Sequence, residues 1–190
     1  MSQKLSRRAL FLTGSAAVAL SAPTTAQSLG DLFKKKDKLK KFTDNNMFAG
    51  RSFKGKKAPS ITFQEWVANQ PSSTRGKPIL LKFFATWCPV CRSSPPLLNR
   101  IQAELGHKLT IIALSNEDSQ LIRDKYISRY KVNYPVARDG SMKLYNKYQM
   151  REAYPHYVII DRGGIVRYEG ILPINDYPRM KARIMQKARI

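Results

Sequence analysis

Beyond residue 57, hydrophobic positions follow two different spacings along the chain. Two nearly continuous apolar runs, at 78–85 and 109–114, predict buried β-strands that are covered on both faces. Three other segments repeat apolar residues at helical spacing and predict helices at 97–105, 116–130 and 141–148. The pattern therefore alternates strands with helices, as in an α/β domain.

The end of the chain adds a hairpin and one more helix. Two short apolar segments, 157–160 and 165–168, flank Asp161-Arg162-Gly163-Gly164, whose glycines suit a tight turn between antiparallel strands. Residues 176–190 predict a basic amphipathic helix whose apolar positions cover the sheet. Together these elements predict a mixed β-sheet flanked by helices on both faces.

The first 26 residues have the pattern of a cleavable signal peptide. A basic start is followed by an apolar stretch lightened by small residues, and no acidic residue occurs before position 27. The pair Arg7-Arg8, directly before hydrophobic residues, resembles a twin-arginine export signal. Cleavage is expected after Ala26, with Ala22 as the second candidate. This pattern predicts an exported, periplasmic protein.

A basic lead-in, residues 27–57, precedes the domain predicted for 58–190. Between positions 31 and 57 there are ten lysines and arginines but three aspartates, within a chain whose net charge is +21. Two interpretations stay open: a mobile tether, or a short surface helix that contacts an acidic partner or an anionic membrane surface. Nucleic acid is not expected as a partner, because the basic stretch lacks regularly interleaved aromatic residues.

The amino-acid composition excludes several classes of protein. A chain of 190 residues has room for one buried core, and its 43% hydrophobic content is too high for a disordered protein. Two cysteines, 10 glycines and 11 prolines exclude disulfide-dense and collagen-like folds. The two cysteines therefore carry the main chemical signal.

These cysteines form the motif Cys88-Pro89-Val90-Cys91, where the first buried strand ends and a helix begins. Proline suits the first helical position and disfavours a helical conformation in the residue before it, so Cys88 is expected to be the N-cap. Its sulfur then faces unpaired backbone N–H groups and the positive end of the helix dipole, which favour a thiolate. Cys91 lies on the same helix face, within reach for a disulfide. The sequence thus predicts Cys88 as nucleophile and Cys91 as resolving thiol.

A structural role for this pair is less favoured. A bridge that closes so short a loop stabilises a fold little, so in an oxidising compartment redox chemistry is the better interpretation. No second CxxC completes a zinc site, and neither His107 nor His156 lies at zinc-finger spacing, so no metal site is predicted. His156 is interpreted as a histidine at the start of a strand.

Two segments resemble a known family. The run 79–91, ILLKFFATWCPVC, and the later run 154–166, YPHYVIIDRGGIV, look like the thioredoxin-like TlpA/ScsD/DsbE group of exported thiol-disulfide oxidoreductases. The resemblance covers about 58–171 and implies a thioredoxin fold with a redox-active CxxC. It further implies that Pro155 is a cis-proline facing the disulfide, beside which the Tyr154 backbone pairs with an extended substrate. Trp87 would cap the disulfide, and Pro96 would match a helix-kinking proline. From the residues alone, Pro155 also fits the start of a strand.

Some positions depart from the family pattern. Six residues before the first cysteine, where thioredoxins carry a buried acid, this chain has Lys82. If Lys82 points beneath the motif, its charge favours thiolate and makes the disulfide easier to reduce. A lysine within a buried strand more often extends to an edge, where it would have no effect.

Three functions are compatible with these residues. The first is a TlpA-like reductase that passes electrons from a membrane-bound thiol reductant to protein disulfides, with no cofactor besides the Cys88–Cys91 disulfide. The second is a DsbA-like dithiol oxidase, coupled to a membrane-bound oxidant, which an inward Lys82 would support. The third, a thioredoxin-fold Cu(I) chaperone, is disfavoured because such proteins use a longer cysteine spacing and a distal histidine.

Overall fold

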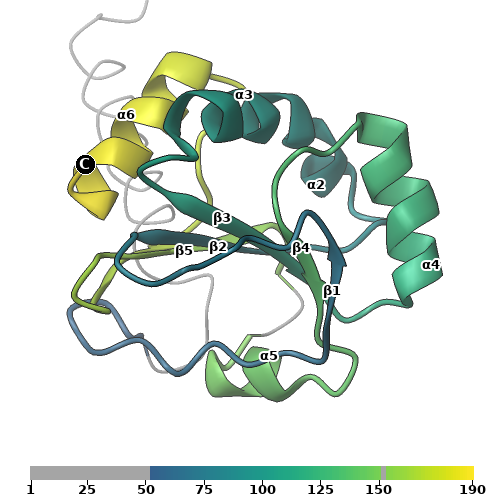
Figure 1. Ribbon diagram of the computed structural model, residues 1–190, viewed down its shortest axis with the longest axis horizontal. Helices are drawn as coiled ribbons and strands as arrows, with labels where there is room; N and C mark the ends of the chain where they lie inside the picture. Colours follow the sequence, from purple (N-terminus) through teal and green to yellow (C-terminus); the bar gives the residue numbers. More distant parts are fainter. Residues whose placement is uncertain (1–51, 151–152) are drawn as a thin grey trace, which may run out of the picture. The chain divides into compact units, whose positions relative to one another are not determined.

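The structure, a computed structural model, describes residues 52–150 and 153–190 (Figure 1). The predicted signal peptide, with its two cleavage positions, and residues 27–51 of the predicted lead-in lie outside the described residues. Within the described part, no helix combines the length and apolar character needed to cross a membrane.

A six-stranded mixed sheet with the order β1-β4-β3-β2-β5-β6 forms the centre of the domain. Strands β2, β3 and β4 are parallel to one another, whereas β1, β5 and β6 each pair antiparallel with a neighbour. The two predicted apolar strands and the predicted hairpin are all present. The strands are β1 (Glu65–Ala68), β2 (Ile79–Phe83), β3 (Thr110–Ser115), β4 (Val136–Arg138), β5 (His156–Ile160) and β6 (Val166–Gly170).

Helices cover both faces of this sheet, as the sequence predicts (Figure 1). Helices α3 and α6 lie over one face, and α5 lies against the opposite face. The predicted helix 116–130 is present in two parts, because the short α4 continues directly into the π-helix η1. The helical elements are α2 (Pro89–Ser93), α3 (Pro95–Leu105), α4 (Ser119–Ile122), η1 (Arg123–Ser128), α5 (Lys143–Lys147) and α6 (Tyr177–Ala188).

Strand β2 shows why its sequence is almost continuously apolar. Leu80 and Phe84 belong to the core that α3, α6 and η1 cover, whereas Leu81 and Phe83 belong to the core that α5 covers. Since successive side chains of a strand point to opposite faces, a strand buried on both faces needs apolar residues at nearly every position. Lys82 is the exception in this strand, and it lies on the same face as Leu80.

The turn of the β5–β6 hairpin uses the glycine that its geometry requires. Gly164 has a φ of +76°, in the left-handed region that favours glycine. Its N–H donates to the carbonyl of Asp161 at 2.9 Å, and the Asp161 carboxylate accepts from the N–H of Ile165 at 3.0 Å. Strand β5 also pairs antiparallel with β2, with His156 opposite Phe83, and this pairing places the residues that precede β5 beside the start of α2.

The domain's contacts begin before position 58. The backbone N–H groups of Phe53 and Lys54 donate to the carboxylate of Glu169 on β6, at 3.1 and 3.2 Å. Lys57 forms an isolated antiparallel bridge with Ile165. Residues 52–57, part of the predicted basic lead-in, are therefore attached to the edge strand β6 by hydrogen bonds of their backbone.

Candidate active site

Cys88 caps the helix that follows β2. Its backbone is extended, with φ −73° and ψ 116°, because Pro89 occupies the first turn of α2 and disfavours a helical residue before it. The Cys88 sulfur accepts a hydrogen bond from the N–H of Cys91 at 3.3 Å. The predicted strand-to-helix placement is thus present, with the sulfur against the unpaired N–H groups of a helix start.

The two cysteines differ in exposure. Cys88 retains 5% of its surface, whereas Cys91 is fully buried. Both are free thiols in this structure. Burial raises the pKa of the Cys91 thiol, and the charge of Lys82 opposes that shift. Cys88 is therefore the sulfur that a substrate can reach, and Cys91 lies behind it.

The loop before β5 completes the surface around Cys88. The Tyr154–Pro155 peptide bond is cis, as the family resemblance implied. The thiol of Cys88 donates to the carbonyl oxygen of Tyr154 at 3.5 Å, so this loop lies directly beside the nucleophile. Trp87 is 62% exposed and packs edge-on against the Tyr154 ring, with 5.9 Å between centroids. Trp87, Cys88, Tyr154 and Pro155 thus lie together.

Lys82 points beneath the motif, not toward an edge. It is fully buried, and its Nζ donates to Ser94 Oγ and to Tyr126 Oη, both at 2.6 Å, and to the carbonyl of Cys91 at 3.3 Å. The expectation that it extends to an edge was wrong, because β2 is a central strand and these acceptors lie directly above it. Burial lowers the pKa of Lys82 to about 7, against the opposing effects of Cys91 and Cys88.

A carboxylate that the sequence analysis missed fixes the turn before the motif. Glu117 accepts hydrogen bonds from the N–H of Thr86 at 2.6 Å, from the Thr86 hydroxyl at 2.7 Å and from the Ser115 hydroxyl at 3.0 Å. A signal for it existed in the sequence. Glu117 lies two residues after the end of β3, and the carboxyl ends of the parallel strands β2 and β3 lie side by side.

The helix after the motif breaks two positions before Pro96, the proline that the resemblance implied would kink it. Helix α2 ends at Ser93, and Pro95 occupies the first position of α3, so the interruption falls at Ser94. Pro96 comes one position later, inside the first turn of α3, where a missing N–H costs nothing. This break directs the Ser94 hydroxyl inward to the carbonyl of Cys91, at 2.8 Å.

The remaining candidates have simpler positions. His156 begins β5 and is buried, with its ring 6.2 Å from the ring of Phe83, and burial lowers its pKa to about 3. This agrees with its interpretation as a strand-start histidine. Among the described residues, no group of three or more His, Cys, Asp or Glu side chains is placed to hold a metal ion.

A mixed sheet with a CxxC at the start of a helix and a cis-proline facing it defines the thioredoxin-like class of proteins. Residues 54–169 match the AhpC/TSA family, which is more than half of the chain, and the chain belongs to this family.

The relatives agree with this assignment. The chain is 31% identical over 97 residues to the thiol-disulfide oxidoreductase ResA of Oceanobacillus iheyensis, an alignment that covers 50% of each chain. It is 29% identical over 120 residues to the thioredoxin-like protein YneN of Bacillus subtilis, covering 60% of this chain and 68% of that protein. The chain thus spans about half to two thirds of the length of these curated relatives.

Solved structures support the same fold. A thiol:disulfide interchange protein of the thioredoxin family, from Chlorobium tepidum, superposes with a TM-score of 0.57 and 27% identity. The superposition covers 73% of this chain and 99% of that one. The predicted thioredoxin-like α/β fold is confirmed.

Proposed function

We propose that this protein is an exported thiol-disulfide oxidoreductase that exchanges electrons with protein disulfides through Cys88 and Cys91. The asymmetry of the two cysteines carries the proposal: an accessible sulfur caps a helix beside the Tyr154 carbonyl, and a second sulfur is buried behind it. The names of the relatives, thiol-disulfide oxidoreductase and thiol:disulfide interchange protein, support the same reaction.

The proposed reaction has two exchange steps. The Cys88 thiolate attacks one sulfur of a substrate disulfide, forming a mixed disulfide and releasing the other substrate sulfur as a thiolate. Cys91 then attacks the sulfur of Cys88, so the Cys88–Cys91 bond forms and the second substrate sulfur leaves. The substrate gains two electrons and the protein loses two. No cofactor besides this disulfide takes part.

Substrate binding follows from the loop beside Cys88. The backbone of Tyr154, next to cis-Pro155, borders the nucleophile and suits an extended substrate segment that pairs with it as an added strand. The exposed ring of Trp87 packs on Tyr154 and provides an apolar edge to the same surface. These residues position a substrate sulfur within reach of Cys88.

As the leading candidate, the protein is a reductase of the periplasm. A membrane-bound thiol reductant would return the disulfide to two thiols after each turnover. The signal pattern at 1–26 supports export, and the basic segment 31–57 suits an acidic partner or an anionic membrane surface.

The position of Lys82 favours a second candidate, a dithiol oxidase that works in the reverse direction. A positive charge beneath the motif stabilises thiolate and therefore the reduced form, which makes the disulfide more oxidising. The reduction potential of the Cys88/Cys91 pair decides between the candidates. A value near about −270 mV supports the reductase, and one near about −120 mV supports the oxidase.

Trapping tests the reaction itself. Cys91→Ser removes the resolving thiol, so this variant should accumulate mixed disulfides between Cys88 and its substrates, visible on non-reducing gels and identifiable by mass spectrometry. Cys88→Ser is the matched control and should trap nothing. Trapping by Cys88→Ser alone would reverse the two roles, and trapping by neither variant would contradict the proposed function.

A further inference from the structure

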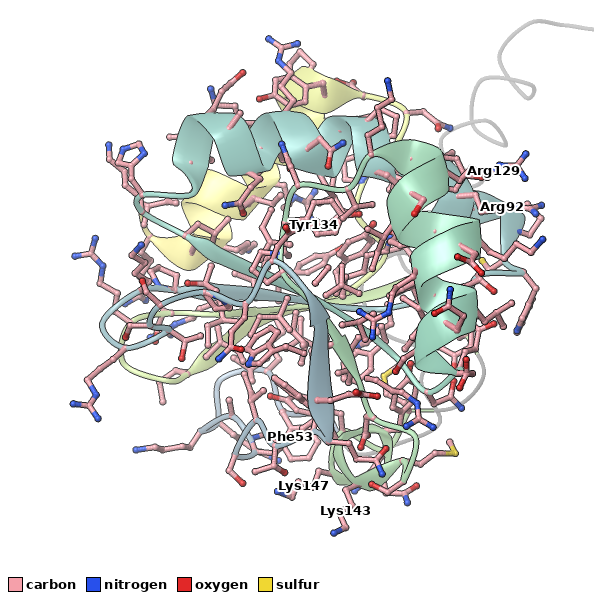
Figure 2. The ribbon with its side chains drawn as sticks, turned by 45° about the vertical axis from the view of Figure 1, so that its right-hand side comes forward. Phe53, Arg92, Arg129, Tyr134, Lys143 and Lys147 are labelled. Atoms are coloured by element: carbon pink, nitrogen blue, oxygen red, sulfur yellow. The ribbon has the colours of Figure 1, made fainter. Side chains whose placement is uncertain are left out.

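Lys82 is a buried cation whose surroundings contain aromatic rings, hydroxyls and two thiols. Its Nζ lies 5.2 Å from the centroid of the Phe84 ring and 5.0 Å from that of Tyr126. In Figure 2, Arg92 and Arg129, on the neighbouring helical segments, point away from the interior, whereas Tyr134 lies inside, between the sheet and the helices. An isolated charge in such a place is costly unless another charge compensates it.

The hydrogen bonds around Nζ suit an ammonium group. An ammonium has three hydrogens and no lone pair, and Nζ has three acceptors within reach. The Ser94 hydroxyl donates its own hydrogen to the carbonyl of Cys91 and therefore accepts from Lys82. The hydroxyl of Tyr126 lies 2.7 Å from that of Tyr134 and can accept from Lys82 while it donates to Tyr134. The site is thus built for the protonated form.

Few titratable side chains are placed to compensate the charge of Lys82. The titratable side chains that face this site are Cys91 and Cys88 on the α2 side, Tyr126 on η1, Tyr134 before β4 and Tyr157 on β5. Burial raises the pKa of all three phenols, so they are neutral near neutral pH. In the described part of the chain, the thiolates of Cys91 and Cys88 are the negative charges that oppose the loss of charge at Lys82, and a thiolate exists only when the motif is reduced. The compensation of Lys82 therefore depends on the redox state of the motif.

We propose that Lys82 is a positioning residue whose ammonium group stabilises the thiolate that Cys91 forms for its attack on the mixed disulfide and gives up its proton when the disulfide forms. This deepens the proposed function and rests on it. In the mixed disulfide, the Cys91 thiolate attacks the Cys88 sulfur, the bond between Cys88 and the substrate sulfur breaks, and that sulfur leaves with the electron pair. The Lys82 proton ends on the departing substrate sulfur, so the products are a substrate thiol, the Cys88–Cys91 disulfide and a neutral Lys82.

The direction of the pH effect follows. In the disulfide form the cysteines carry no charge, so burial alone acts on the pKa of Lys82 and lowers it. In the reduced form the thiolate holds the proton to a higher pH. Lys82 is therefore expected to lose its proton at a lower pH in the oxidised than in the reduced protein.

Redox equilibration with glutathione across about pH 5.5 to 9 tests the proposal on the wild-type protein, Lys82→Met and Lys108→Met. Lys82→Met keeps the volume without the charge and should make the motif at least tenfold harder to reduce at pH 7, or ~30 mV. Lys108 is an exposed lysine near the start of β3, at the opposite end of the sheet from the motif, and its variant should match the wild type. A Lys82→Met curve within twofold of the wild type at every pH would overturn the proposal.

A second measurement needs no variant. The 15N chemical shift of Lys82 Nζ, followed by NMR during a pH titration, should show this amine losing its proton at a lower pH in the oxidised than in the reduced wild-type protein. Identical titrations in both states would refute the coupling. Failure of the proposed function looks different: the wild type would then form no Cys88–Cys91 disulfide with oxidised glutathione.

Discussion

Lys82 and Phe83 are neighbours in β2, both fully buried, yet they lie on opposite faces of the sheet and in different chemical surroundings. On its face, Phe83 contacts the rings of Tyr145 and Tyr148, at 5.0 and 5.6 Å between centroids. On the other face, Lys82 makes three hydrogen bonds beneath the cysteine motif. One face mainly provides apolar burial, and the other holds a polar group next to the reacting sulfurs.

Among the residues that the structure describes, each face also holds one buried basic side chain. His156 pairs with Phe83 across β2 and β5 and so lies on the α5 face, and burial alone lowers its pKa. For Lys82, burial likewise lowers the pKa, but the charges of Cys91 and Cys88 oppose the shift. Burial therefore keeps the imidazole neutral, whereas the charge of Lys82 is tied to the state of the cysteines. Changes on the α5 face should alter stability, and changes on the Lys82 face should alter redox behaviour.

Phe83→Ala gives the largest expected effect. Removal of this ring leaves a cavity in a packed core and should lower the free energy of unfolding by about 3–5 kcal/mol, measured by urea denaturation. The glutathione equilibrium of the remaining folded protein should match the wild type, because the ring lies on the face away from Lys82. Phe83→Leu, the conservative control, should cost less. A Phe83→Ala protein that keeps its stability but shifts its redox equilibrium would break the division between the two faces.

The parts that the sequence predicted are the ones with local signals. The apolar run of β2, the proline after Cys88 and the glycines of the β5–β6 turn each determine structure within a few residues. Strands β1 and β4 were missed because they have four and three residues, too few for a periodic pattern.

The contacts of the residues that support the site were beyond the sequence for a different reason. Lys82, Tyr126 and Tyr134 converge from separate elements, and the orientation of Lys82 depends on β2 being a central strand. Glu117 likewise reaches Thr86 only because β2 and β3 lie side by side. Such contacts follow from the tertiary arrangement and leave no periodic trace along the chain.

Burial of His156 on the α5 face should make the stability of the protein sensitive to acid. Its pKa in the folded protein, about 3, lies below its ordinary value of 6.5, so the unfolded chain takes up a proton first as the pH falls. Stability from this group is complete above about pH 6.5 and should decline by about 1.4 kcal/mol between pH 7.5 and 5.5.

Denaturant titrations of His156→Phe at both pH values check this. The variant should lose less stability on acidification than the wild type, by about 1.4 kcal/mol. His107→Phe, at an exposed position, is the matched control and should leave the wild-type pH dependence intact. If both variants lose as much unfolding free energy on acidification as the wild type, the folded His156 takes up its proton in the ordinary range. The assignment of a neutral, buried imidazole would then be wrong.

The smallest effect, from Tyr126→Phe, bears most directly on why the Lys82 face is polar. Loss of this hydroxyl removes one of the three acceptors of Lys82 and the partner of the Tyr134 hydroxyl, which should cost about 1 kcal/mol of unfolding free energy. In a Lys82→Met background there is no ammonium group to use that acceptor, so the same substitution should cost clearly less unfolding free energy. A double-mutant cycle measures the difference. Equal costs in the two backgrounds would mean that the Tyr126 hydroxyl serves Tyr134 alone. The polar cluster would then be an ordinary hydrogen-bonded core, and its position beneath the cysteines would have no consequence for Lys82.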